Sequence, residues 1–230
     1  MASVFDLHVH TTKGSSDSSL SPEEMVREAK RIGLTGVCLT EHSGWLDRHA
    51  FDLFARQQDI VLIRALEVET EYGHVLVFGL DGYLPGATRL QDLQRLVRKV
   101  GGFMVAAHPF RYLFNTPPYN RNLLYKDPRL YPKTPQEASR HTVFEVVDAI
   151  EVVNGANSEE ENRFALEVAR LLGKPGTGGS DAHSVHGLGK GVTIFDGPIR
   201  NEKDFLEALR AGAFRPGEGF PVGTPRPFAV

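Results

Sequence analysis

The feature that most restricts the fold of this chain is a regular alternation of short apolar runs with amphipathic segments. Runs at residues 36–40, 60–66 and 103–107 are typical of buried strands. Segments with apolar residues at helical spacing lie between them, for example at residues 89–100. Because strands that alternate with helices usually form a parallel sheet covered by helices, this order predicts an α/β fold.

The complete pattern predicts a barrel. We expect strands over residues 4–10, 36–40, 60–66, 74–78, 103–107, 149–153, 175–180 and 191–195, and helices over 22–32, 46–57, 89–100, 159–172 and 201–210. Ser21, Pro22 and the acidic pair Glu23 and Glu24 are typical of a helix N-terminus. About seven such strand–helix units predict a parallel sheet that closes, or nearly closes, on itself.

Residues 109–141 interrupt the pattern. They are rich in Pro, Asn, Tyr and Arg and show little periodicity, so we expect a long surface insertion of the kind that forms lids or binding loops. Its aromatic residues either contact a substrate or hold the loop against the barrel; they are Tyr112, Phe114, Tyr119, Tyr125 and Tyr131.

Charge and composition exclude several classes of protein. The formal net charge of −3 gives no basis for binding nucleic acid or membranes through bulk basicity. The single Cys38 excludes an internal disulfide and a thiolate zinc cluster. No apolar run approaches the roughly 18 residues of a membrane span, and residues 1–10 lack a signal-peptide core, so we expect a cytoplasmic protein.

Most of the nine histidines lie at the ends of the predicted strands. His8 and His10 end the first strand, His42 follows the second, His108 ends the strand at 103–107, and His183 follows the strand at 175–180. In a β/α barrel the carboxyl ends of the strands form one face, on which active sites are built. These side chains are therefore expected to meet.

Two pairs of residues at these strand ends suit metal binding. Residues two apart on a strand point to the same side, so His8 with His10, and Asp181 with His183, can each present two ligands to one point. Imidazole and carboxylate ligands without thiolate favour zinc, manganese or iron over calcium.

Four motifs occur in order along the chain, namely DLHVHT at residues 6–11, TEH at 40–42, AHP at 107–109 and GSDAH at 179–183. This series resembles that of the PHP (polymerase and histidinol phosphatase) family of metal-dependent phosphoesterases. The resemblance covers essentially the whole chain. It implies one domain over residues 1–230, a distorted (β/α)7 barrel with its metal site at the carboxyl ends of the strands, and an insertion at about 111–142 over the active-site face.

The resemblance also implies which residues hold two or three divalent ions. The first ion would be held by His8, His10, Glu67 and Asp181, with Glu67 bridging to a second at His74 and His108, and a third would be held by Asp17, His42 and His183. Glu69 and Glu71 share the strand parity of Glu67, but Glu67 directly follows the buried run, as the family's glutamate does. Glu41 stands where the family often has Asp, and we expect it behind the ligands.

Substrate contacts follow from the same resemblance. Arg111 lies where related enzymes carry an arginine that grips phosphate, and a bidentate guanidinium suits that task. We assign Arg111 and Asp181 to catalysis. Lys190 and His141 are further candidates for substrate binding, His141 as a proton donor if the insertion acts as a lid.

These observations predict a metal-dependent hydrolase that cleaves a phosphate ester through a metal-bridged hydroxide. Its substrate would be a small phosphorylated metabolite, a nucleotide or a nucleic-acid end. One alternative is a non-catalytic PHP module for partner binding. The other is an amidohydrolase-type enzyme, which would carry a bridging lysine at a strand end where this chain has Glu67 and His74. No feature of the sequence indicates an oligomeric state.

Overall fold

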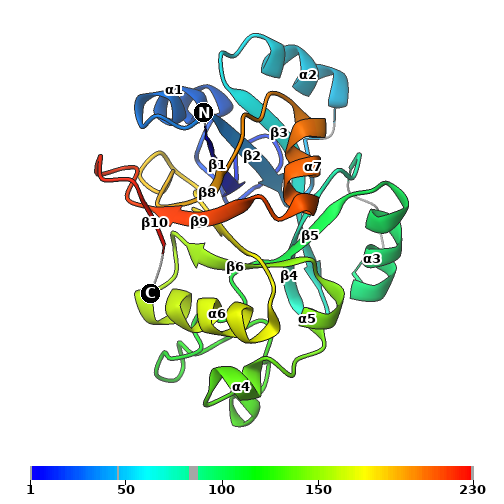
Figure 1. Ribbon diagram of the computed structural model, residues 1–230, viewed down its shortest axis with the longest axis vertical. Coiled ribbons are helices and arrows are strands. Elements are labelled where there is room, and N and C mark those ends of the chain that lie inside the picture. The colour runs from blue at the N-terminus through cyan, green and yellow to red at the C-terminus, as the bar shows by residue number, and fades with distance from the viewer. Residues whose placement is uncertain (1, 46, 83–87, 229–230) are drawn as a thin grey trace.

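A computed structural model describes residues 2–45, 47–82 and 88–228, in which ten strands form a single curved sheet (Figure 1). The strands are β1 (Ser3–Val9), β2 (Gly36–Glu41), β3 (Val61–Thr70), β4 (Gly73–Phe78), β5 (Phe103–Ala106), β6 (Ala149–Asn154), β7 (Gly176–Gly179), β8 (Gly191–Phe195), β9 (Phe214–Glu218) and β10 (Arg226–Pro227). Their order in the sheet is β10-β9-β8-β1-β2-β3-β4-β5-β6-β7. The last two strands were not expected, because Pro216 and Gly217 in β9 are typical of turns.

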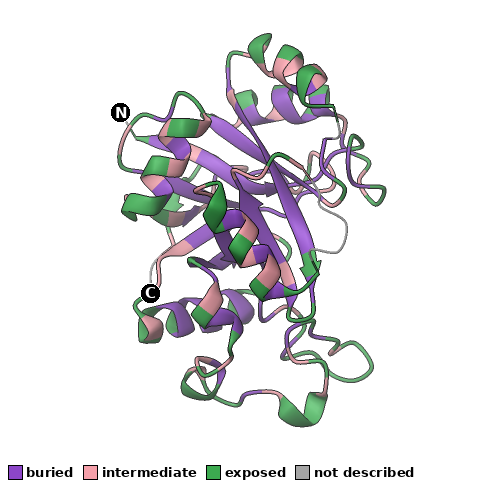
Figure 2. Cartoon of the chain, turned by 90° about the vertical axis from the view of Figure 1, so that its right-hand side faces the viewer, coloured by how far each residue is buried: buried purple, intermediate pink, exposed green. Residues whose placement is uncertain are grey.

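The helices surround this sheet, with α1 and α2 at the top of Figure 1 and α4 and α6 at the bottom. They are α1 (Pro22–Arg31), α2 (Arg48–Arg56), α3 (Leu90–Lys99), α4 (Pro135–Ala138), α5 (Val143–Val146), α6 (Glu159–Leu172) and α7 (Glu202–Ala211). Ser21 caps α1 as predicted, since its side chain accepts a hydrogen bond from Glu24 N. Leu46, at the start of the helix expected over 46–57, lies outside the described residues. Figure 2 shows buried strands and helices whose outer sides are exposed.

The expectation of a parallel sheet is wrong in part. Strands β1, β2 and β3 are parallel, as are β5, β6 and β7, but β4 is antiparallel to both β3 and β5. Strand β8 is antiparallel to β1. The physical reason for the β4 reversal is that only Glu71 and Tyr72 separate β3 from β4, and strands joined by so short a turn must be antiparallel.

The far end of the sheet returns to β1 and nearly closes a barrel. Asp181 N donates a hydrogen bond to His8 O over 2.7 Å, and His10 N donates to Ala182 O over 3.0 Å. Val9 and Ala182 form an isolated parallel bridge. The nearly closed barrel is therefore confirmed, and its closure joins the two segments that carry His8, His10 and Asp181.

Glycines in β7 make this closure possible. A Cβ atom on Gly178 would overlap the carbonyl oxygen of Val192, and one on Gly179 would overlap the Cβ of His8. The sequence Gly-Thr-Gly-Gly thus lets β7 lie against β1 and β8 at a distance that larger residues would prevent.

The insertion after His108 is not irregular along its whole length, because parts of it form short helices. It contains a short 3-10 helix at Pro128–Leu130 and helix α4. The ring of Phe114 lies 5.3 Å from that of Phe164 on α6, and the Tyr125 hydroxyl donates to Ala138 O over 3.2 Å. Tyr131 accepts a hydrogen bond from Asn122 N over 3.0 Å. Tyr125 and Tyr131 therefore bond within the insertion, and Phe114 packs it against α6.

Two aromatic residues of the insertion remain largely exposed. The exposed fractions are 46% for Tyr112 and 73% for Tyr119.

Among the helices that the structure describes, none combines the length and the apolar character that crossing a membrane requires.

A buried carboxylate fastens the closed side of the barrel. Asp6 is fully buried on β1, and its Oδ1 accepts hydrogen bonds from Ser180 N over 2.8 Å and from His8 N over 3.2 Å. Its Oδ2 accepts from Gly189 N over 2.9 Å, which ties β1 to the segment before β8. Burial raises the pKa of Asp6 to about 6, against the hydrogen bonds that favour the carboxylate.

We expect Asp6→Asn to lower the free energy of unfolding by about 1–3 kcal/mol, because an amide nitrogen cannot accept a hydrogen bond and would leave a buried donor unpaired. Urea unfolding at pH 7 with a chelator present measures this without a contribution from bound metal. Asp196→Asn is the matched control, since Asp196 is 60% exposed and should change stability by less than about 0.5 kcal/mol. Equal stability of the two variants would contradict the role given to Asp6.

Candidate metal centre

Glu67 is the centre of a cluster of histidines on one face of the barrel. It lies near the end of β3 and is only 3% exposed. Its carboxylate oxygens lie 2.8–3.4 Å from a nitrogen of each of five imidazoles, those of His8, His10, His42, His74 and His108. The structure therefore brings together side chains from β1, β3, β4 and the segments after β2 and β5.

The imidazoles determine the charge of Glu67. Burial alone would raise the pKa of this carboxyl group, but the charge of His8 and hydrogen bonds from His10, His108 and His74 hold the pKa well below its usual range. A buried carboxylate in this position is ionised and needs positive charge around it.

The antiparallel direction of β4 explains how His74 reaches the cluster. His74 lies near the start of β4, opposite Glu69 in the register with β3. Because β4 runs against β3, its beginning lies at the same edge as the carboxyl end of β3. In a fully parallel sheet the beginning of β4 would lie at the opposite end of the barrel from the carboxyl end of β3.

His8, His10 and Asp181 form a first group of possible ligands. The Nε2 atoms of the two histidines are 3.1 Å apart, and Asp181 Oδ1 lies 3.4 Å from the first and 3.3 Å from the second. Atoms that bind a tetrahedral zinc ion at about 2.1 Å are about 3.4 Å from each other. The separations in this group therefore fit a cation of that size.

Two further groups adjoin the first. His8, Glu67 and His108 can converge on one point, with His74 Nδ1 2.8 Å from Glu67 Oε1. His10, His42 and His183 can converge on another, where Asp17 Oδ2 lies 3.4 Å from His42 Nε2 and 3.2 Å from His183 Nε2. The side chains of Asp17, His42 and His183 are 55%, 37% and 33% exposed, so this group is more open to solvent than the other two.

All nine predicted ligands thus lie in one connected cluster. The alternatives to Glu67 do not join it, because Glu69 is exposed and lines an adjacent cleft, and Glu71 accepts a hydrogen bond from Leu90 N at the start of α3. The cleft has a volume of about 570 Å³ and is also lined by His42, Ser43, Thr70, His74 and Thr88.

Glu151, which the sequence analysis did not identify, supports the cluster from behind. Its Oε1 lies 2.9 Å from His8 Nδ1, and its Oε2 accepts from His108 N over 2.7 Å. A carboxylate on the remote nitrogen of an imidazole fixes the ring and directs the other nitrogen toward a metal. The only signal in the sequence is an acidic residue within the apolar run 149–153.

Glu41 supports the ring of His10 as Glu151 supports that of His8, but through the hydroxyl group of Ser15. Ser15 Oγ lies 3.0 Å from His10 Nδ1 and donates a hydrogen bond to Glu41 Oε2 over 2.7 Å. Glu41 is fully buried and also accepts from Thr11 N. It therefore lies behind the cluster, as expected.

The predicted substrate residues have different positions. Arg111 reaches the cluster, where its Nη2 donates to Asp181 Oδ2 over 2.5 Å. Lys190 is exposed, and its Cβ atom lies beside Gly155, just after β6. The ring of His141 lies among Tyr72, Tyr125 and Phe144 rather than among the ligands, and burial lowers its pKa.

Backbone strain is concentrated at this face. His108, Tyr112 and Asp181 have φ angles of 29°, 62° and 55°, which non-glycine residues seldom adopt. Such strain persists where surrounding contacts impose it, and it is common at functional sites.

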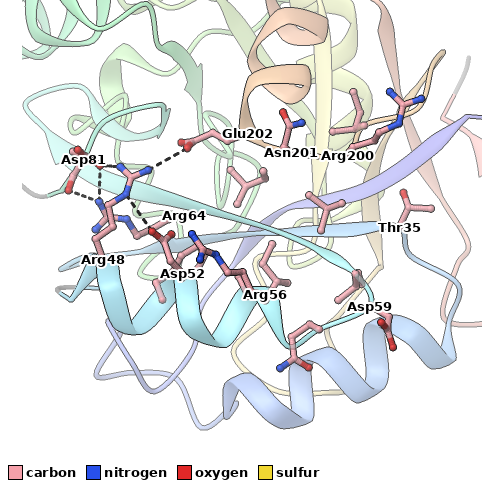
Figure 3. A pocket seen from close by; sticks show the side chains of 18 of the residues that line it. Thr35, Arg48, Asp52, Arg56, Asp59, Arg64, Asp81, Arg200, Asn201 and Glu202 are labelled. Carbon is pink, nitrogen blue, oxygen red and sulfur yellow. Dashed lines mark hydrogen bonds and ion pairs between the residues drawn. The ribbon is translucent and has the colours of Figure 1, made fainter.

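A larger cleft of about 660 Å³ lies between α2 and α7 and contains none of the predicted ligands (Figure 3). Two of its arginines pair with acidic side chains, since Arg48 contacts Asp81, Asp52 and Glu202, and Arg64 donates to Asp81 Oδ1 over 3.0 Å. The predicted metal ligands therefore lie on the histidine face and not in this cleft.

Comparisons with known proteins agree with these features. A 5'-3' exoribonuclease of Haemophilus influenzae is 29% identical over 103 residues, which cover 43% of this chain and 37% of that protein. A two-domain protein from Bacteroides vulgatus containing a predicted PHP-like metal-dependent phosphoesterase superposes with a TM-score of 0.63 at 22% identity, over 94% of this chain and 64% of that one. A lesion-specific endonuclease from Pyrococcus furiosus superposes with a TM-score of 0.59 at 17% identity. The superposition covers 92% of this chain and 56% of the endonuclease chain.

Identities this low support the fold alone, and the chain spans little more than a third of the Haemophilus protein. Two family models match the chain directly. One, described as PHP-associated, matches residues 159–214, and the other, described as the PHP domain, matches residues 6–134 and so covers more than half of the 230 residues. The chain therefore belongs to the PHP family, as its motifs indicate.

Proposed function

We propose that this protein hydrolyses a phosphate ester with divalent metal ions bound in the cluster around Glu67. The observation that carries the proposal is the convergence of five imidazoles on one buried carboxylate, at separations that suit metal ligands. Membership of a family of this chemistry supports it.

The residues would hold the ions in three groups. His8, His10, Glu67 and Asp181 would hold one, Glu67, His74 and His108 a second, and Asp17, His42 and His183 a third. Zinc, manganese or iron bound there would polarise the phosphate ester and lower the pKa of a water molecule.

The chain itself would supply orientation and further charge. Arg111, which donates to Asp181, would contact an oxygen of the phosphoryl group, where its permanent positive charge opposes that of the substrate. Glu151 and Ser15 would keep the rings of His8 and His10 in the orientation that binding requires. The cleft lined by Ser43, Glu69 and Thr88 would receive the remainder of the substrate.

The substrate would be a small phosphorylated metabolite, a nucleotide or a nucleic-acid end. The likeness to a 5'-3' exoribonuclease supports the nucleic-acid end. The net charge of −3 supports contact at an end rather than along a long nucleic acid, because such contact needs a basic surface. A panel of an aryl phosphate, sugar phosphates, nucleotides and 5'-phosphorylated oligoribonucleotides tests these classes against one another.

Replacing either His8 or Asp181 with Ala should lower turnover by at least about 100-fold and reduce the amount of bound metal, because each change removes a buried ligand. Elemental analysis of protein purified without chelator, with turnover on the substrate panel, measures both effects. His49→Ala, at an exposed histidine on α2, is the control and should retain metal and activity. Undiminished turnover in both ligand variants would refute the proposed site.

Glu151→Gln should weaken metal binding by about 10–100-fold while leaving every ligand in place, because the carboxylate that fixes the His8 ring loses its charge. Titration of the metal-free protein with Zn²⁺ or Mn²⁺ measures the affinity without reference to turnover. Glu145→Gln changes an exposed residue on α5 in the same way and should leave the affinity unchanged. If both variants bind metal like the unmodified protein, Glu151 does not orient His8.

A further inference from the structure

Arg111 is held along one edge of its guanidinium. Nε donates to Asn157 Oδ1 over 2.9 Å, and Nη2 donates to Asn154 Oδ1 over 2.7 Å and to Asp181 Oδ2 over 2.5 Å. An arginine has five N–H donors, so these bonds occupy Nε and both hydrogens of Nη2. Across the described residues, no hydrogen bond uses Nη1 of Arg111, and its two N–H groups remain for a ligand.

This geometry corrects the expected mode of contact. A bidentate fork would use two nitrogens of Arg111, but the Nε and Nη2 edge already has protein partners. A phosphoryl group would therefore meet Nη1 alone. The side chain of Arg111 is 18% exposed, which leaves one end of it open to a ligand.

Two of the three acceptors on Arg111 carry no charge. Asn154 and Asn157 supply amide oxygens, which hold the guanidinium without neutralising it. Asp181 is the third acceptor, but it also lies 3.4 Å from His8 Nε2 and 3.3 Å from His10 Nε2. Its negative charge is thus shared with other positive groups of the cluster.

The amide of Asn154 has a defined orientation. Its Nδ2 donates to Glu151 Oε2 over 2.9 Å, so its Oδ1 must face the other way, toward Arg111 and Ala156 N. Asn157 follows on the same segment after β6, where its backbone N–H donates to Asn154 O over 3.2 Å. The carboxylate that orients His8 therefore also orients an acceptor of Arg111.

We propose that Asn154 and Asn157 are positioning residues that form a neutral cradle for Arg111. The cradle directs Nη1 at the phosphoryl group and adds no negative charge that would weaken its attraction for phosphate. This inference rests on the proposed phosphoesterase function. Asn157 is the better residue to test, because the side chain of Asn154 also donates to Glu151 and accepts from Ala156 N, and its loss would disturb the loop.

The decisive comparison is between Asn157→Asp and Asn157→Ala in the metal-loaded protein. The Asp variant keeps the size and the acceptor oxygen but adds a charge that pairs with Arg111. We expect it to raise the inhibition constant of inorganic phosphate and the KM by about tenfold, with a smaller change in kcat. The Ala variant should raise both constants by only about threefold. If Asn157 had only a structural role, the Ala variant would be the more damaged of the two.

Asn201→Asp is the matched control. Asn201 is exposed and caps α7 by accepting a hydrogen bond from Asp204 N, which Asp can also accept, so this variant adds the same charge elsewhere. Its phosphate inhibition constant should equal that of the unmodified protein. Metal content and thermal stability should be the same in all these variants.

The outcomes separate this inference from the proposed function. If Asn157→Asp leaves phosphate inhibition unchanged while Arg111→Ala weakens it, the neutral cradle is refuted and the phosphoesterase proposal stands. If the metal-loaded protein neither hydrolyses any phosphoester of the panel nor is inhibited by phosphate, both are refuted.

Discussion

The contact between one buried carboxylate and five imidazoles is the interaction on which the rest of this structure depends. Glu67 carries a negative charge that is stable in a buried position only because positive groups surround it. No single strand can supply five imidazoles to one point, so the groups come from separate elements that the curved sheet brings together. The barrel is in this sense the means by which distant parts of the chain reach one carboxylate.

The closure of the barrel has an equally local cause. Glycines in β7 allow its backbone to lie against β1, and Asp6 then bonds to backbone groups on the far side of the junction. The same junction places Asp181 next to His8 and His10. The packing that stabilises the fold and the geometry of the site are therefore two results of one set of contacts.

Much of the fold and of the candidate site could be predicted from the sequence. Polar residues follow the short apolar runs of the strands, and strand periodicity gives the side to which each side chain points. The direction of β4 could not be predicted, since β3 continues beyond the expected end at residue 66 to Thr70 and leaves only a two-residue turn before β4. Glu151, Asn154 and Asn157 were missed for a different reason. Their roles depend on which side chains tertiary packing places beside them, and no motif records that. The roles of the metal ligands and of the insertion stay predictions.

Glu151 touches the ring of His8, the backbone of His108 and the amide of Asn154, and through Asn154 it reaches Arg111. A single carboxylate thus borders both the groups proposed to hold metal and the group proposed to hold phosphate. Under those proposals the two affinities are thermodynamically linked: an ion that orders this network favours the anion, and the anion favours the ion by the same factor. Selection could then not adjust one affinity through Glu151 without changing the other.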